Sequence, residues 1–89
     1  MESKIQAKCR KYLESIGAYV VKVVVANHSG CPDLLVCYKG QFIGIEVKDY
    51  DRQPSEIQKY HLNEIRKAGG ISICVHSLDE MIFKLEEAL

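Results

Sequence analysis

Apolar side chains recur every three or four positions in three stretches of this chain, which cover residues 5–16, 57–68 and 78–89. This spacing places them on one side of an α-helix, so each stretch is predicted to be an amphipathic helix with one buried face. The predicted buried faces are Ile5, Cys9, Tyr12, Leu13 and Ile16; Ile57, Tyr60, His61, Ile65 and Ala68; and Leu78, Met81, Ile82, Leu85 and Leu89.

Polar residues at the expected helix ends support these assignments. The segments Ser3–Gln6 and Ser77–Glu80 have the spacing of a capping box, in which a serine hydroxyl accepts a hydrogen bond from a backbone N–H three residues later. Pro54 or Ser55 begins the second helix, and Gly17 ends the first.

Four segments are predicted to be strands, and they lie at residues 19–25, 33–38, 41–48 and 71–75. Tyr19 to Val25 is rich in β-branched residues, which predicts a strand buried on both faces. The second and third strands are joined at Lys39-Gly40, which has the length and composition of a tight hairpin turn. Residues 27–32 and 49–53 are polar and predicted to be loops.

The predicted order of elements is α-β-β-β-α-β-α. Three antiparallel strands are followed by a helical crossover, which is expected to be right-handed and to add a parallel fourth strand. We therefore expect one α/β domain over residues 1–89, with a mixed four-stranded sheet flanked by helices.

Composition narrows the class of protein. The 89 residues are 47% hydrophobic and 27% charged, with 12 basic and 12 acidic side chains, which is typical of a soluble globular domain and excludes a disordered chain. The longest apolar runs fall far short of the ~20 residues that span a bilayer. With no secretory signal visible, we expect cytoplasmic residence, and the small size suggests a phage or bacterial origin.

Charge is distributed unevenly although the net charge is zero. Residues 1–22 carry five basic and two acidic side chains, whereas residues 79–89 carry one basic and four acidic ones. Lys4, Lys8 and Lys11 form a basic stripe on the first helix, and two interpretations stay open for them: contacts with nucleic-acid phosphates, or an ordinary solvated helix face.

The four cysteines contain no C-x-x-C pair. His28 and Cys31 have the spacing of half a zinc site, but no second half follows. We expect reduced thiols that are mostly buried, as is common in the cytosol.

The hairpin register predicts that three charged side chains lie on the same face of the sheet. If Lys39-Gly40 is a two-residue turn, paired residue numbers sum to 79, so Asp33 lies opposite Glu46 with their Cβ atoms about 5 Å apart. Lys48 shares that face because side chains alternate along a strand. Two interpretations remain open here: a structural salt-bridge cluster, or a site in which the two carboxylates bind a divalent cation such as Mg²⁺ or Mn²⁺.

The pattern Gly30-Cys-Pro-Asp33, then twelve residues, then Glu46-Val-Lys48 resembles the signature of PD-(D/E)XK nucleases, which have a restriction-endonuclease-like fold. Together with Glu2 before the first helix and Gln58 in the second, it resembles the VRR-NUC branch. The resemblance extends from Glu2 to Gly70.

This resemblance implies a role for each matching residue. Asp33, Glu46 and the backbone carbonyl of Val47 would bind Mg²⁺, with Mn²⁺ able to substitute, and Lys48 would position the attacking water. Glu2 would act through a water on the metal, and Gln58 would lie near the active site. Two other interpretations remain open: Glu2 in a favourable position at the helix dipole, and Gln58 as the reciprocal member of a capping box with Ser55.

The resemblance implies a metal-dependent DNA endonuclease that leaves 5′-phosphate and 3′-hydroxyl ends. The chain shows no base-reading motif, so we expect recognition of DNA shape, with branched DNA as substrate. Stand-alone VRR-NUC domains are similar to dimeric Holliday-junction resolvases, so we expect a homodimer that cuts four-way junctions, with Phe83 as a candidate interface residue. The alternative is a catalytically silent nucleic-acid-binding module on the same scaffold.

Overall fold

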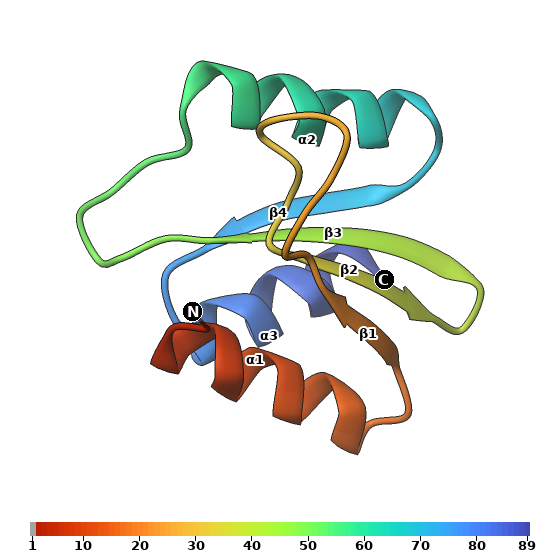
Figure 1. The fold of residues 1–89 in the computed structure, drawn as a ribbon. Helices are drawn as coiled ribbons and strands as arrows, with labels where there is room; N and C mark the ends of the chain where they lie inside the picture. The colour runs from red at the N-terminus through yellow and green to blue at the C-terminus, as the bar shows by residue number, and fades with distance from the viewer. Residues whose placement is uncertain (1) are drawn as a thin grey trace.

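The computed structural model of the chain describes residues 2–89 and shows the predicted αβββαβα order (Figure 1). Among these residues, no helix is long and apolar enough to cross a membrane. The elements are α1 (Lys4–Ser15), β1 (Tyr19–Lys22), β2 (Leu34–Tyr38), β3 (Gln41–Val47), α2 (Glu56–Lys67), β4 (Ile71–Val75) and α3 (Leu78–Ala88).

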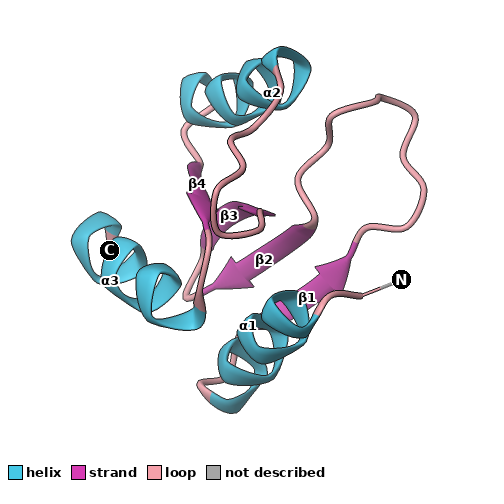
Figure 2. Cartoon of the chain, turned by 90° about the vertical axis from the view of Figure 1, so that its left-hand side faces the viewer, coloured by secondary structure: helices cyan, strands magenta, loops and turns pink. Residues whose placement is uncertain are grey.

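The four strands form one mixed sheet in the order β1-β2-β3-β4. β1 and β3 each pair antiparallel with β2, and β4 lies parallel to β3, so the predicted fold class is confirmed. Helices α1 and α3 cover one face of the sheet, and α2 lies over β3 and β4 on the other face (Figures 1 and 2).

The β2–β3 hairpin has the register that the two-residue turn predicts. Lys39 and Gly40 both have positive φ, at 49° and 80°, as a tight hairpin turn requires. Leu34 lies opposite Ile45, and Tyr38 lies opposite Gln41, so paired residue numbers sum to 79.

The hydrophobic core lies between the sheet and the pair α1–α3. Alternate residues of β2 and β3 point into it, and the helices contribute the buried sides of their amphipathic faces. The fully buried apolar side chains here are Cys9, Leu13, Leu34, Ile43, Ile45, Val75 and Met81.

Serine side chains cap all three described helices. The hydroxyl of Ser3 accepts from the Gln6 N–H, and Ser55 and Gln58 form both halves of a capping box. Ser77 also accepts from the Glu80 N–H, but the Glu80 carboxylate accepts from the backbone N–H of His76 rather than completing the box at Ser77.

The prediction for β1 was wrong in length and burial. The strand ends at Lys22 and lies at the edge of the sheet, where Tyr19 is 72% exposed. Val24 and Val25, which were assigned to this strand, lie in the following loop and are 81% and 89% exposed. A run of apolar residues indicates that a segment can form a strand. Whether that strand is buried depends on its place in the sheet, and β1 has a neighbouring strand on one side only.

The buried face predicted for α2 was also partly wrong. Leu62 is its only buried residue, whereas Ile57, Tyr60 and Ala68 are exposed, because α2 covers only β3 and β4. Smaller corrections concern Ile16 and Leu89, which are exposed just after α1 and α3. The cysteines were expected to be mostly buried, but only Cys9 is buried, whereas Cys31 and Cys74 are half-buried and Cys37 is exposed.

Two side chains cover the outer edge of β4. Arg66 donates to the Ser72 carbonyl at 2.9 Å, and Lys84 donates to the Cys74 carbonyl at 2.7 Å. Because unpaired edge carbonyls favour pairing with another chain, these two cations protect this edge from strand addition.

Gly30 allows the long β1–β2 loop to lie against the start of α2. Its φ is +85°, and a Cβ atom here would lie 2.9 Å from Ile57 Cγ1 and 3.0 Å from the Ile57 carbonyl. The glycine of the motif therefore satisfies both a left-handed backbone and a close approach to a helix.

Gly30→Ala is expected to lower the free energy of unfolding by about 2–4 kcal/mol, because it adds a clash to the strain of positive φ. Gly40→Ala is the matched control, since Gly40 has φ of +80° and nothing within 4 Å of an added Cβ. It should cost only about 1–2 kcal/mol. Equal losses in urea unfolding of the two variants would contradict this role of Gly30.

Candidate active site

The hairpin brings two carboxylates together at one end of the sheet. Asp33 directly precedes β2, one register step beyond the Leu34–Ile45 pair, and Glu46 is its counterpart in β3. Asp33 Oδ2 accepts a hydrogen bond of 2.8 Å from the backbone N–H of Val47, which orients the carboxylate toward β3. The predicted juxtaposition of Asp33 and Glu46 is therefore present.

Glu46 is a carboxylate in the protein interior. The residue is only 2% exposed, and the Lys48 ammonium lies 3.7 Å from its Oε2. Burial, and after it the neighbouring Asp33, raises the pKa of Glu46 to about 7, although Lys48 acts in the opposite direction. The backbone of Lys48 is anchored by a 2.9 Å hydrogen bond from its N–H to the Val75 carbonyl.

The second carboxylate oxygen of Glu46 has no partner in the site. Glu46 Oε1 is buried and has no hydrogen-bond partner among residues 2–89. A buried polar atom without a partner is costly, and Lys48 reaches only the other oxygen. A divalent cation fits this place, because carboxylate and carbonyl oxygens are the ligands that Mg²⁺ and Mn²⁺ prefer. A salt bridge to Lys48 alone leaves Oε1 without a donor whenever Glu46 is ionised.

Two thiols flank this acidic pair. Burial raises the pKa of Cys31, and the charges of Glu46 and Asp33 raise it further; the pKa of Cys74 is likewise raised by burial and then by Glu46. All four cysteines are free, as expected. Within the part of the chain that the structure describes, no three His, Cys, Asp or Glu side chains gather as a metal cluster, so His28 and Cys31 stay without a second half.

Glu2 is held by a residue that the sequence analysis did not single out. Its two carboxylate oxygens accept from Arg10 at 2.8 and 3.1 Å, and these hydrogen bonds lower the pKa of Glu2. Glu2 precedes α1 and lies eight residues before Arg10, whereas ion pairs along a helix join residues three or four apart, so spacing was no signal for this contact. The structure places Glu2 in an ion pair with Arg10 of α1.

Gln58 has the capping role that was left open for it. Its side-chain oxygen accepts from the Ser55 N–H at 2.8 Å, and its own N–H donates to the Ser55 hydroxyl at 3.3 Å. This leaves the amide NH₂ group as the part of Gln58 that is available to a substrate.

A small hollow of about 190 Å³ adjoins Lys48, and Arg52 lines it from the β3–α2 loop. Its other lining residues are Ser3, Gln6, Val47 and Asp49. The start of α1, with its unpaired backbone N–H groups, thus lies beside two cations. Arg52 was missed by the sequence analysis because nothing in a polar loop indicates where its side chain lies.

Lys4, Lys8 and Lys11 are exposed on α1, and none forms an ion pair with another of residues 2–89. Both interpretations of this basic stripe therefore stay open.

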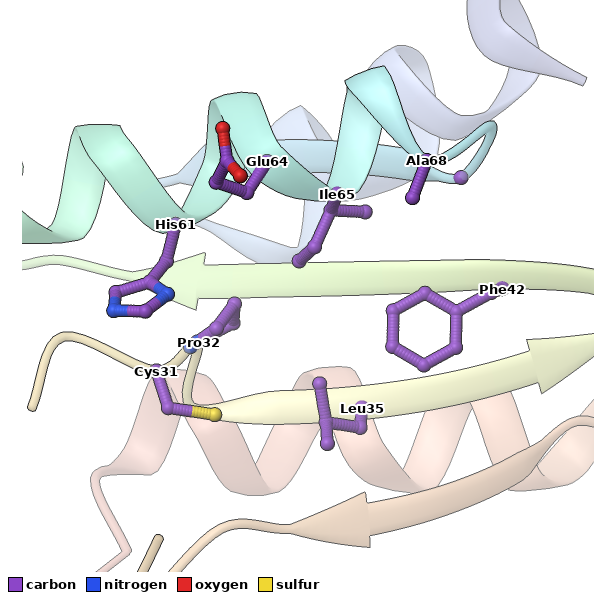
Figure 3. Close-up of a pocket in the computed structure, with 9 residues that line it drawn as sticks. Cys31, Pro32, Leu35, Phe42, His61, Glu64, Ile65 and Ala68 are labelled. Carbon is purple, nitrogen blue, oxygen red and sulfur yellow. The ribbon is translucent and has the colours of Figure 1, made fainter. Parts of the chain in front are cut away.

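A second, larger pocket of about 470 Å³ lies between α2 and the sheet, and Cys31 and Pro32, which directly precede Asp33, are among its lining residues (Figure 3). Pro32, Leu35, Phe42 and Ile65 point into it, whereas the Glu64 carboxylate points away (Figure 3). The pocket exists because α2 covers only part of this face of the sheet.

His61 lies at the rim of this pocket, where its ring centroid is 5.5 Å from that of His28. His61 was predicted on the buried face of the second helix, and the structure makes it half-buried.

Comparisons with known proteins agree with this architecture. A solved structure described as a VRR_NUC domain superimposes with a TM-score of 0.80 at 32% sequence identity, over 97% of this chain and 94% of that one. A second, described as a VRR_NUC domain protein, gives a TM-score of 0.54 at 21% identity, over 88% of this chain and 60% of that one. No family model matches the sequence, and no curated protein matches it significantly.

The mixed sheet with helices on both faces is that of the restriction-endonuclease-like fold, the class in which PD-(D/E)XK nucleases are found. The first match covers nearly the whole of both chains, so this chain belongs to the VRR-NUC family and is a nuclease-type domain.

Glu46→Gln is expected to stabilise the metal-free protein at pH 8 by about 2–3 kcal/mol. The folded pKa of about 7 exceeds the ordinary 4.5, so wild-type stability should fall as pH rises across that window. Urea unfolding in EDTA from pH 4.5 to 8 measures this. Glu56→Gln, whose side chain is 93% exposed, is the control and should change little. A Glu46→Gln variant no more stable than wild type at pH 8 would contradict a costly buried charge.

Proposed function

We propose that this domain is a metal-dependent DNA endonuclease that hydrolyses phosphodiester bonds. The observation that carries the proposal is the buried, unpartnered Glu46 Oε1 beside Asp33, with the Lys48 ammonium 3.7 Å from the other oxygen. Membership of the VRR-NUC family supports the nuclease chemistry, and DNA as the substrate.

Asp33, Glu46 and the Val47 carbonyl would hold Mg²⁺, or Mn²⁺ in its place. The cation would neutralise charge on the scissile phosphate and lower the pKa of a water nucleophile. Asp33 is oriented for this by the Val47 N–H. Lys48, whose backbone is anchored on Val75, would donate a hydrogen bond to the attacking water and stabilise the developing negative charge.

Glu2 and Gln58 have supporting roles in this proposal. Glu2 would act through a water on the metal, which requires that one of its oxygens be released from Arg10. Gln58 would use its amide NH₂ group near the scissile phosphate while its oxygen remains in the cap. The exposed Lys4, Lys8 and Lys11 would contact backbone phosphates, which is a sequence-independent mode of binding.

The alternative is a catalytically silent DNA-binding module. The acidic pair argues against it, because two carboxylates repel both each other and the DNA backbone. A module that only binds DNA gains nothing from a buried Glu46 with an unpartnered oxygen.

Purified protein with Mg²⁺ or Mn²⁺ should cleave DNA, and Asp33→Ala should not. Glu46→Gln should weaken Mn²⁺ binding, measured by calorimetry, by about tenfold or more, since it removes an anionic ligand. Lys48→Ala should slow cleavage by about 10²–10³-fold yet keep most of the metal affinity, because an ammonium is not a ligand.

Glu56→Gln is the matched control and should leave both readouts unchanged. Equal loss of metal affinity in Glu46→Gln and Lys48→Ala would contradict the assigned roles. Wild-type protein that leaves linear and branched DNA uncut with either metal would support the silent module.

We further propose that the domain acts as a homodimer on four-way junctions. A domain of this size leaves much of its surface exposed, and a twofold dimer would present two sites to a junction with near-twofold symmetry. Phe83 is 64% exposed on the outer side of α3, and Phe42 is 48% exposed at the apolar pocket, so the surface offers apolar side chains for such an interface.

Sedimentation at micromolar concentration should therefore show a dimer, and junction cleavage should be faster than cleavage of linear duplex. Phe83→Glu should shift the protein toward monomer and remove the paired nicks while single-strand nicking persists. Phe42→Glu tests the opposite face. A wild-type monomer, or equal rates on junction and duplex, would remove the dimer proposal and leave the nuclease proposal standing.

A further inference from the structure

His76 joins two segments that are distant in the sequence. It lies between β4 and α3, and the β3–α2 loop that follows Lys48 passes beside it at the same end of the molecule (Figure 1). One ring nitrogen, Nδ1, lies 2.9 Å from Glu80 Oε1, and the other, Nε2, lies 2.8 Å from the backbone carbonyl of Arg52.

Both partners of this ring are acceptors only. The Arg52 carbonyl has no proton to give. Burial acts to raise the pKa of Glu80, but hydrogen bonds from Lys84 and from the backbone and ring of His76 outweigh it and lower the pKa to about 2, so this carboxylate is ionised. Two hydrogen bonds from one imidazole to two acceptors require that both ring nitrogens carry protons.

The charged groups around His76 fit this cationic form. The carbonyl of Arg52 and the Glu80 carboxylate raise the pKa of His76, and burial and Lys84 act in the opposite direction. Lys8 of α1 and Asp79 of α3 line the same shallow hollow, one of each sign. Lys84 is itself bound to Glu80 Oε2 at 2.9 Å and to the Cys74 carbonyl, which partly satisfies its charge.

The loop that His76 holds carries a free cation beside the proposed active site. Arg52 lines the hollow next to Lys48 and the start of α1, and its guanidinium has no hydrogen bond or ion pair with any of residues 2–89. A guanidinium in such a place matches the geometry of a phosphate group.

We propose that His76, in its doubly protonated form, is a positioning residue that clamps the β3–α2 loop to the start of α3 and so holds Arg52 beside Lys48 for contact with a backbone phosphate of DNA. This rests on the proposed function only in taking DNA as the ligand. When His76 loses a proton, the remaining proton stays on Nδ1, because the ionised Glu80 carboxylate is a stronger acceptor than the Arg52 carbonyl. The hydrogen bond from Nε2 to Arg52 is then lost and the loop is released. DNA affinity therefore falls as pH rises through the titration of His76.

The clamp itself is tested without DNA or metal. Ring-nitrogen NMR of the three histidines between pH 5.5 and 9 should show His76 doubly protonated at pH 7, with the amide signals of residues 49–53 shifting at the same midpoint. His28 and His61 are internal controls whose titration should leave those amides unchanged. A neutral His76 at pH 7, or loop amides that ignore its titration, would overturn the proposal.

The consequence for DNA is measured in EDTA and in the Glu46→Gln background, which stands for wild type throughout this series, so that it depends neither on cleavage nor on the titration of Glu46 in the same pH range. Fluorescence anisotropy with a four-way junction at constant ionic strength should show wild-type affinity falling roughly fivefold between pH 6.5 and 9, as for the loss of one phosphate contact. Arg52→Ala should bind weakly at all pH values, with a salt dependence reduced by about one contact.

His76→Gln should match Arg52→Ala and show no pH dependence, whereas His28→Gln should keep the wild-type profile. A pH profile unchanged in His76→Gln, or no binding by wild type at any pH, would overturn the proposal. Binding with the expected profile but no cleavage by the unsubstituted protein with metal would contradict the nuclease proposal alone.

Discussion

A buried carboxylate beside a second carboxylate is electrostatically costly, and the β2–β3 hairpin of this domain holds Glu46 in that position. The positive φ angles of Lys39 and Gly40 set the two-residue turn, the turn sets the register, and the register places Asp33 opposite Glu46. The Val47 N–H orients Asp33, and Lys48 only partly compensates the charge of Glu46. The fold therefore accepts a local instability, which a bound cation would relieve.

Glycines allow the elements around this site to pack closely. Helix α2 lies directly on β3 because Gly44 leaves room for Ile65: a Cβ atom at Gly44 would lie 2.6 Å from Ile65 Cδ1. Gly30 brings the β1–β2 loop against the start of α2 in the same way. The rest of that sheet face remains an apolar pocket rather than a closed core (Figure 3).

Charged side chains at the surface of the domain fix the positions of neighbouring elements, and they contribute less to stability than the core does. Arg66 and Lys84 cover the open edge of β4, and Glu80 binds Lys84 on one side and His76 on the other. These contacts link the end of the sheet to α3 and to the loop after Lys48. Because the groups are partly exposed, their value lies in fixing geometry rather than in adding much stability.

Much of this structure could be predicted from rules that act between residues close together in the sequence. The helix and strand order, the hairpin register, and the face shared by Asp33, Glu46 and Lys48 all follow from periodicity and turn geometry, which act between near neighbours in the chain. The exposure of Tyr19 and Val21 on β1 did not follow, because the same β-branched residues suit an edge or a central strand, and only the position in the sheet decides. The contact of His76 with the Arg52 carbonyl likewise depended on tertiary structure, since it joins segments 24 residues apart.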